Sequence, residues 1–473
     1  MKRILVLAII LCVASEFVRA QQTSSSAHVE GRNFESTSCL SSTQREEILQ
    51  KLELNKQELA DHGKLISTNR NSIVLFDWPT QSAEVDPSFG NFCITGYVDN
   101  NPAYPNLLSD YNCGAATYDT QDGYNHAGTD IYTWPFAWYH MAQNEIEVIA
   151  AADGQIVGKD DGNSDQSCAW NSNGWNAVYV EHSDGSVAWY GHMKNGTPTS
   201  KNIGETVVAG EYLGVVGSSG NSSGPHLHFE IYDAGNNLID PFYGACNNFN
   251  SSSWWNAQIP YVESKINHIG IGYTWPSPFP PCPTIESPNE QFAFQATDTI
   301  FLTPYFNYLK ANDVAAFRIY DANMQLYFYW YMDNQWGAFQ LAYISYWLIP
   351  GLGAPEGIWT AEVDYEGITY IENFQVGSLP TSAGNIFSEN VISVFPNPSS
   401  GNIFLEIHSS KNQQTSIEMF NSLGEKVFAE EKNLVAGVNK IVLEQNLPDG
   451  IYFLKYSDAE KISTSQMSVL NQP

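Results

Sequence analysis

Apolar and polar residues alternate over short stretches along most of this chain, and the pattern predicts strands joined by tight turns. The clearest case runs from 176 to 192, where two runs rich in strand formers flank Ser183-Asp184-Gly185-Ser186. An Asp-Gly pair between two such runs is a strong hairpin signal. Residues 317–320 and 326–330 have the same character. We therefore expect a mainly β protein.

A different pattern occupies the segment before this strand-rich region. From residue 43 the chain is rich in helix formers, and Leu49, Leu52 and Leu59 have a spacing that suits one face of a helix. Residues 21–85 are therefore predicted to be a partly helical pro-region or spacer. The domain that follows is placed at 86–265.

The content of proline, glycine and serine divides the rest of the chain. The predicted segments are a Pro-rich linker at 266–283, a β-sandwich accessory domain at 284–376, a second linker at 377–390 and a terminal unit at 391–473. The many aromatic residues of the accessory domain favour a sandwich core, and a ligand platform is the alternative.

Residues 1–20 have the pattern of a cleavable signal peptide. A basic start at Lys2 and Arg3 precedes an apolar run from 4 to 14, and Val18-Arg19-Ala20 provides a small-x-small cleavage site. The apolar run is too short to span a bilayer comfortably. We expect an exported chain, extracellular or attached to the cell surface, with no transmembrane segment after cleavage.

The cysteines that remain after signal cleavage are expected to form disulfides, because the compartment outside the cell is oxidising. Cys93 and Cys113 bracket a loop-rich segment and are the first pair expected. Sequence alone does not choose among the other pairings. If Cys39 leaves with a pro-segment, one of the remaining five cysteines must stay free.

Charge narrows the choice of partners. The formal net charge is −30, from 21 basic and 51 acidic residues. A chain with this charge repels the phosphates of nucleic acid and an anionic membrane surface. We therefore expect no nucleic-acid partner, and the acidic surface is typical of a protein that stays soluble outside the cell.

Two short patterns carry residues that can bind a metal. A spacing of four puts His126 and Asp130 on one side of either a helix or a strand, and the residues around them favour loop and strand. From His226 the chain alternates so that His226, His228 and Glu230 share one face of a strand. Two imidazoles on one strand face, about 7 Å apart, can converge on one site, although an exposed polar face would also fit.

His192 is the third element of this chemistry. The hairpin at 176–192 places it on the same face as Tyr190 and Ala188. The other histidines of this region, at 140, 182 and 268, are predicted to be structural.

Zinc is the expected ion for such a set of residues. Two imidazoles and one carboxylate leave a fourth position for water, which is typical of catalytic zinc sites, whereas structural sites are closed, often by cysteines. A zinc-bound water has a pKa near 7, and a neighbouring imidazole can accept its proton.

Four motifs in one order make the pattern specific. They are His126-x-Gly128-x-Asp130, Trp189-Tyr190-Gly191-His192-Met193, the glycine-rich stretch 214–224, and Pro225-His226-Leu227-His228-Phe229-Glu230. Over residues 120–235 the chain resembles the lysostaphin/LytM-type zinc endopeptidases, peptidase family M23. The resemblance implies Zn²⁺ on His126, Asp130 and His228, general-base or transition-state roles for His226 and His192, and an antiparallel sheet with an open groove.

The terminal unit has a resemblance of its own. Its blocks begin at Val394, Asn421 and Leu447, and they resemble the C-terminal sorting domain of proteins exported by the bacterial type IX secretion system. The resemblance implies a small β-sandwich at 391–473 and the type IX machinery as a partner.

The leading hypothesis is a secreted zinc endopeptidase that cuts peptide cross-bridges of bacterial peptidoglycan. Cleavage of elastin or other glycine-rich extracellular proteins is an alternative with the same chemistry. A non-catalytic wall-binding or activator module is the alternative of another class, but such modules typically lack metal ligands. Residues 134–144 and 160–175 depart from the family pattern and are expected to form groove walls.

Overall fold

The computed structural model describes residues 28–32, 39–69, 73–82, 90–121, 123–169 and 171–377, and the strands of the C-terminal unit between 392 and 469. The predicted signal peptide and, of the predicted linker at 377–390, residues 378–390 lie outside the described residues. The prediction of a mainly β protein is confirmed, because strands far outnumber the two helices among the described elements.

The central unit is built on one large antiparallel sheet. Its strands lie in the order β3 (Phe92–Gly96), β4 (Thr129–Thr133), β11 (His226–Tyr232), β8 (Val187–Gly191), β7 (Ala177–His182), β6 (Gly154–Asp160) and β9 (Thr206–Val207), and β12 (Leu238–Ile239) pairs with β11. Strands β7 and β8 are the predicted hairpin. A second sheet of β10 (Tyr212–Val215), β5 (Ile146–Ile149) and β2 (Thr80–Ser82) also contributes to the core.

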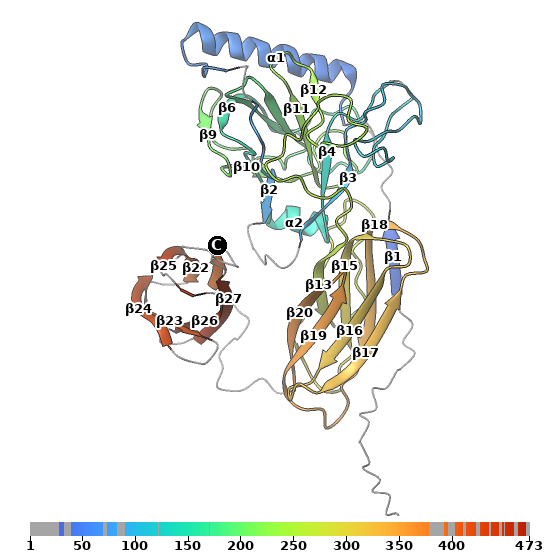
Figure 1. The fold of residues 1–473 in the computed structure, drawn as a ribbon, viewed down its shortest axis with the longest axis vertical. Helices are drawn as coiled ribbons and strands as arrows, with labels where there is room; N and C mark the ends of the chain where they lie inside the picture. The colour runs from blue at the N-terminus through green and yellow to red at the C-terminus, as the bar shows by residue number, and fades with distance from the viewer. Residues whose placement is uncertain are drawn as a thin grey trace, which may run out of the picture.

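The two faces of the large sheet have different coverings. One face points into the main core, where Leu227, Phe229 and Ile231 of β11 are fully buried. Helix α1 (Ser42–Asp61) covers the other face, and Ile48 and Leu52 lie in one apolar cluster with aromatic residues of β7, β8 and β11. Figure 1 shows this helix running across the end of the unit, close to β6, β11 and β12. The predicted helix is therefore docked on the large sheet.

The accessory domain is a sandwich of two sheets. The first contains β1 (His28–Arg32), β18 (Phe339–Leu348), β15 (Ile300–Leu309) and β13 (Lys265–Gly272). The second contains β14 (Ala293–Phe294), β20 (Ile368–Val376), β19 (Gly357–Tyr365), β16 (Val314–Tyr320) and β17 (Leu326–Asp333). Figure 1 shows the long strands of this unit side by side below the large sheet.

Two predicted boundaries of this domain are wrong. The segment 266–283 was predicted to be a linker, but its first residues form β13, because Ile266, Ile269 and Ile271 are buried in the sandwich core. Strand β1, from the predicted pro-region, adds an edge strand by pairing with β18. The N-terminal segment therefore contacts both the sandwich and the large sheet.

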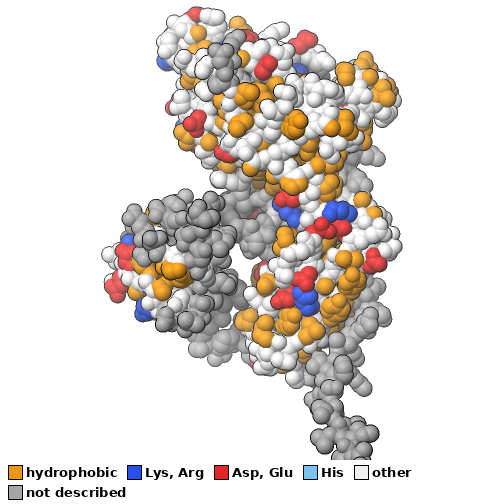
Figure 2. All heavy atoms as spheres, viewed as in Figure 1, with side chains coloured by type: hydrophobic (Ala, Val, Ile, Leu, Met, Phe, Trp, Pro, Cys, Tyr) orange, Lys and Arg blue, Asp and Glu red, His pale blue; other side chains and the backbone are white. Residues whose placement is uncertain are grey.

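Aromatic side chains of the sandwich form its core, as the sequence favoured. Phe317, Trp359 and Phe374 are almost fully buried, although Tyr329 and Tyr331 of β17 are exposed. On the outer face, Arg318 of β16 pairs with Glu362 and Asp364 of β19. Figure 2 shows few charged side chains on this side of the protein, with acidic and basic groups adjoining on the sandwich.

Two disulfides join distant parts of the chain. Cys113 pairs with Cys246, and Cys168 pairs with Cys282. The predicted Cys93–Cys113 pair is therefore wrong. Cys93 lies on β3 and its side chain is buried against the sandwich, where its Sγ is 3.4 Å from the carbonyl oxygen of Gln340. Cys39 is the other described cysteine without a disulfide partner.

The Cys113–Cys246 bridge should contribute strongly to the stability of the large-sheet unit, because it spans a sequence separation of 133 residues. Replacing both cysteines with Ser is expected to lower the free energy of unfolding by about 3–5 kcal/mol. Hydrogen exchange of β4 and β11 in increasing urea measures this loss. A reducing agent should destabilise the wild-type protein more than the variant, and equal exchange in the two proteins would contradict the prediction.

The C-terminal unit has the two sheets expected of a small sandwich. One contains β21 (Ile392–Phe395), β22 (Ile403–Ser409) and β25 (Gly437–Leu443), and the other contains β24 (Lys426–Leu434), β23 (Gln413–Asn421), β26 (Gly450–Ser457) and β27 (Ile462–Val469). Leu405, Ile417 and Leu454 lie in their shared core. No helix of the described residues has both the length and the apolar character needed to cross a membrane.

Candidate metal centre

Strands β4 and β11 bring the two predicted patterns together. In their antiparallel register His228 is directly opposite Asp130, so their side chains leave the sheet on the same face. The Nδ1 atom of His228 is 2.7 Å from Oδ1 of Asp130. Two residues that are far apart in the sequence therefore place one donor atom each at the same point.

His126 joins this pair from the loop before β4. Its Nε2 atom is 3.2 Å from Oδ2 of Asp130 and 3.4 Å from Nδ1 of His228. Gly128 permits the approach, because a Cβ at this position would lie 2.6 Å from the imidazole of His228. The glycine of the His-x-Gly-x-Asp motif is therefore required by close packing against the site.

The outer nitrogen of each imidazole has a fixed partner. Nδ1 of His126 is 2.7 Å from the carbonyl oxygen of Tyr97, and Nε2 of His228 is 2.7 Å from Oε1 of Glu230. Such outer partners orient histidine ligands in metal sites and set their tautomer. The inner nitrogens of both rings therefore face Asp130.

These donor distances suit a zinc ion. Nitrogen and oxygen donors bound to one tetrahedral zinc lie about 3.3 to 3.6 Å apart, as follows from bond lengths of about 2.0 to 2.2 Å. Two of the three distances among His126, Asp130 and His228 are close to this range, and the third is shorter. Two imidazoles and a carboxylate are also a donor set that catalytic zinc uses.

His226 and His192 lie beside these three side chains. Nδ1 of His226 is 2.8 Å from the carbonyl oxygen of Gly224, and Nδ1 of His192 is 2.6 Å from that of Ser219. Their ring centroids are 4.5 Å apart. Nε2 of His226 is 3.6 Å from Oδ1 of Asp130, and Nε2 of His192 is buried without a hydrogen-bond partner in the described structure. Both rings therefore present Nε2 for chemistry at the same place.

The predicted orientation of His192 is wrong, although its place in the site is as expected. Tyr190 and Ala188 face the main core, on the other side of the sheet from the site. His192 follows the end of β8 with a φ of 61°, so the left-handed backbone breaks the alternation of the strand. Its ring then lies 5.8 Å from that of His228.

The carboxylates of the site are held in their charged form. Burial would raise the pKa of Glu230, but the charge of Arg45 and the hydrogen bond with His228 outweigh it and lower the pKa to about 2. Burial also opposes ionisation of Asp130, yet the neighbouring His126 holds its pKa well below the usual value. For His192, burial lowers the pKa and the nearby His226 adds to the effect, so this imidazole is neutral.

Comparison with known proteins agrees with this geometry. Residues 125–241 match the family model described as peptidase family M23, and this range includes all five site residues predicted from the sequence. The chain contains a peptidase family M23 domain. Residues 393–470 match the secretion system C-terminal sorting domain. The chain is therefore secreted or displayed at the cell surface.

Curated relatives match parts of the chain. The DD-carboxypeptidase/endopeptidase Mpg of Neisseria meningitidis serogroup B is 40% identical over 55 residues, which are 12% of this chain and 12% of that protein. The peptidoglycan DD-endopeptidase ShyC of Vibrio cholerae serotype O1 is 30% identical over 106 residues, 22% of this chain and 20% of that protein. The chain thus spans a fifth or less of the length of these relatives, and the similarity supports a peptidase.

Dimeric latent PorU from Porphyromonas gingivalis is similar with a TM-score of 0.18 and 11% identity, over 68% of this chain and 34% of that one. A score this low supports no argument about the fold.

One of the two expected groove walls borders the site of the M23 domain. The ring of Trp175 lies 5.3 Å from that of His192 and 5.8 Å from that of His228. The segment 134–144 packs elsewhere: Trp134 donates a hydrogen bond of 3.0 Å from Nε1 to the carbonyl oxygen of Phe306, in the sandwich. Trp175 of the segment 160–175 therefore contacts the site, whereas Trp134 contacts the sandwich.

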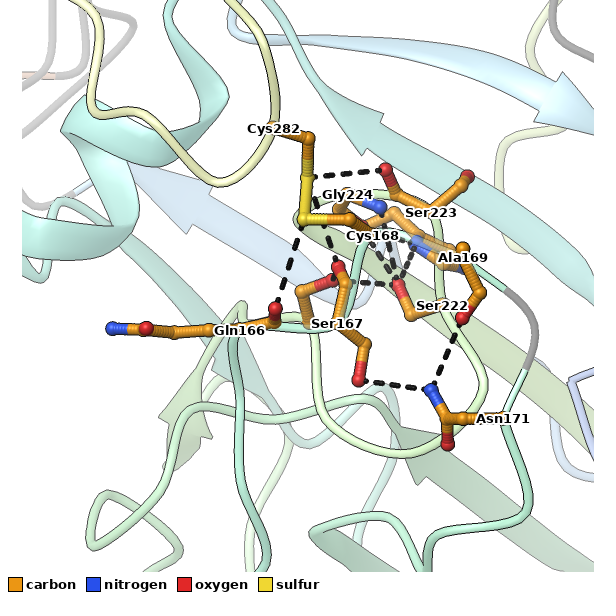
Figure 3. The surroundings of a disulfide bond; sticks show 11 residues. Gln166, Ser167, Cys168, Ala169, Asn171, Ser222, Ser223, Gly224 and Cys282 are labelled. Carbon is orange, nitrogen blue, oxygen red and sulfur yellow. Dashed lines mark hydrogen bonds between the residues drawn. A yellow bond between two sulfur atoms is a disulfide. The ribbon is translucent and has the colours of Figure 1, made fainter.

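A disulfide between this wall and Cys282 lies beside the loop that positions His226. Figure 3 shows the Cys168–Cys282 bridge beside Ser222, Ser223 and Gly224. Ser222 donates a hydrogen bond of 2.9 Å from Oγ to the carbonyl oxygen of Gly224, the same oxygen that His226 contacts. The bridge therefore lies next to the backbone that orients His226.

The histidines predicted to be structural lie outside this group. Nδ1 of His182 is 2.8 Å from the carbonyl oxygen of Asp153, and burial lowers the pKa of His182. His140 pairs with Glu145 and His268 pairs with Glu290. None of the three belongs to a possible metal-binding cluster among the described residues.

Three residues at the site had no assigned role in the sequence interpretation. Glu230 was placed on the correct strand face, but its contact with His228 was not predicted. Arg45 reaches Glu230 from helix α1, and Cys39 lies among the metal-binding side chains. The sequence interpretation considered Cys39 only as a residue that could leave with a pro-segment, which would leave one of the other five cysteines free.

Proposed function

We propose that the M23 domain is a zinc-dependent endopeptidase and that its own metal ligands are His126, Asp130 and His228. The observation that carries this proposal is the convergence of their three inner donor atoms, with the outer nitrogens of both histidines already fixed. A zinc ion at this place would polarise the peptide carbonyl and make a water molecule more acidic.

His226 is the general base in this proposal. Its Nδ1 donates to the carbonyl oxygen of Gly224, so in the neutral ring Nε2 carries the lone pair and can accept a proton from the attacking water. Once protonated, Nε2 can donate to the departing amine. His192 has the same arrangement with Ser219, and its buried Nε2 is available to contact the reacting group. Both imidazoles are positioning and proton-transfer groups that need not bind the metal.

The proposed substrate is the peptide part of bacterial peptidoglycan. It is supported by the names of the relatives, one of which is a peptidoglycan DD-endopeptidase. A complete set of possible ligands argues against a non-catalytic wall-binding module.

Digestion experiments test this substrate. Protein recovered from the culture medium is cut after Lys64, so that the segment before the M23 domain does not cover the site, and is incubated with purified peptidoglycan and, in parallel, with elastin. The released fragments are identified by mass spectrometry. Muropeptides cut within their peptides are the expected result. Release of fragments from elastin alone would show that the protein is a peptidase with elastin, and not peptidoglycan, as its class of substrate. No release from either substrate would contradict the proposal.

Deleting residues 391–473 should leave the protein in the periplasm. We propose that the signal peptide directs a first export step and that the sorting domain, matched at 393–470, directs passage through the type IX machinery. Immunoblots of periplasm and medium, with the full chain as control, measure the distribution. Normal amounts of the truncated protein in the medium would contradict this prediction.

A further inference from the structure

Cys39 lies inside the candidate metal centre although it is far from the M23 domain in sequence. Its side chain is only 3% exposed, and its Sγ is 3.1 Å from the hydroxyl of Tyr118. The ring of Tyr118 stacks on that of His126 at a centroid distance of 4.1 Å. The thiol therefore occupies the interior of the site.

The Sγ atom is close to both halves of the proposed machinery. It forms one group with the donor atoms of His126, Asp130 and His228, all within 4.8 Å of one another. It forms a second such group with His192 and His226. The thiol thus lies between the three proposed ligands and the two imidazoles that would act on water, which is where the open position of a catalytic site must be.

A thiolate at this place would complete the coordination of zinc. Cysteine binds zinc at about 2.3 Å, and four protein ligands give the closed tetrahedron that is typical of sites without catalytic activity. Cys39 also stays unpaired while two disulfides form elsewhere in the described chain. A role other than cross-linking is therefore consistent with its surroundings.

Helix α1 holds Cys39 in position. The helix begins just after Cys39, and its N-terminus is closed by a capping box between Ser41 and Gln44. Arg45 then bonds to Glu230, with Nη2 3.0 Å from Oε1, and Glu230 is the outer partner of His228. The first turn of helix α1 is therefore linked through Glu230 to His228 of the candidate metal centre.

The rest of the helix covers the sheet face on which the site lies. Ile48 and Leu52 are buried against residues of β6, β7 and β8. Nζ of Lys51 lies 2.6 Å from Oδ1 of Asp160. Asn55 donates a hydrogen bond of 2.8 Å from Nδ2 to the carbonyl oxygen of Val157. A peptide substrate that lies along this face of the sheet would meet helix α1.

We propose that Cys39 is a fourth metal ligand and that residues 39–61 keep the peptidase latent until they are displaced. The proposal rests on the proposed zinc site. The thiol loses its proton to solvent when the zinc–sulfur bond forms and regains a proton when that bond breaks. Release can follow a cut in the connector after the helix, where His62, Gly63 and Lys64 are exposed.

Cobalt substitution tests the ligand directly, without measuring activity. The full chain is stripped of metal and loaded with Co²⁺, and the sulfur-to-cobalt charge-transfer band in the near ultraviolet is recorded. The band should be present in the wild-type chain, lost in Cys39→Ser and kept in Cys93→Ser, the matched control at the other buried free cysteine. X-ray absorption of the zinc form should show one sulfur neighbour in the same two proteins.

The outcomes separate this inference from the proposed function. A chain that binds cobalt without the sulfur band would overturn the role of Cys39 and leave the zinc site intact. A chain that binds no cobalt would overturn both. If Cys39→Ser does not fold, the wild-type spectrum and the zinc absorption data still decide the matter.

Latency is tested by cutting the wild-type chain after Lys64 with a lysine-specific protease. Turnover on a peptide substrate should rise and the sulfur band should disappear together as the N-terminal segment is displaced. A chain with Lys64→Gln gives the control for cuts elsewhere. Full turnover by the uncut chain would overturn the proposed latency, even if Cys39 binds the metal.

Discussion

Replacing Asp130 with Ala should remove most of the zinc from the protein and abolish peptide hydrolysis. The wild-type site is expected to hold about one zinc per chain. Asp130 contacts both His126 and His228, so its removal takes away one ligand and the charge that holds the other two together. The change is best made in a Cys39→Ala chain, because a thiolate could otherwise replace the lost carboxylate.

Zinc content by mass spectrometry, beside a turnover assay, measures this effect. Asp161→Ala is a suitable control, because Asp161 is an exposed acidic residue outside the metal cluster. The control should keep its zinc. Full zinc occupancy in the Asp130 variant would show that the proposed ligand set is wrong.

The His226→Ala variant should keep most of its zinc and lose activity by a factor on the order of 10² to 10⁴, the usual contribution of general-base catalysis. His226 can act through Nε2 without binding the metal, because its position is fixed by Gly224. His228→Ala should lose both zinc and activity, because His228 pairs with Asp130 and Glu230 at the centre of the site.

The behaviour of His192 completes this comparison. His192→Ala should resemble the His226 variant, since its ring adjoins that of His226 and its Nδ1 is held by Ser219. His140→Ala serves as the control, because His140 pairs with Glu145 outside the site. Each change is made in the Cys39→Ala chain, as for Asp130, and each protein is cut after Lys64 before zinc analysis and turnover. A zinc-free His226 variant beside a zinc-replete His228 variant would reverse the two assignments.

The sequence predicted those features that depend on neighbouring residues. In β11 the alternation of side chains places His226, His228 and Glu230 opposite the core residues, whatever the strand packs against. The hairpin of β7 and β8 follows from its Asp-Gly turn, and helix α1 follows from its helix formers and apolar spacing. The five predicted site residues are all brought together in the structure.

Tertiary structure alone decided the partners of residues that local patterns leave open. The pairing of Cys113 with Cys246, not with Cys93, depends on how loops meet and on the sandwich that buries Cys93. The orientation of His192 depends on one left-handed backbone position after β8, which reverses the face that strand alternation predicts.

The same limit applies to the N-terminal segment. Its amphipathic helix could be predicted, but the surface that it covers could not, because apolar burial is non-directional and identifies no partner. Only the folded chain places Arg45 on Glu230 and the Sγ of Cys39 among the metal-binding side chains. A strand or helix is determined by residues that are close in sequence, whereas a metal site is determined by distances between residues that only folding makes close.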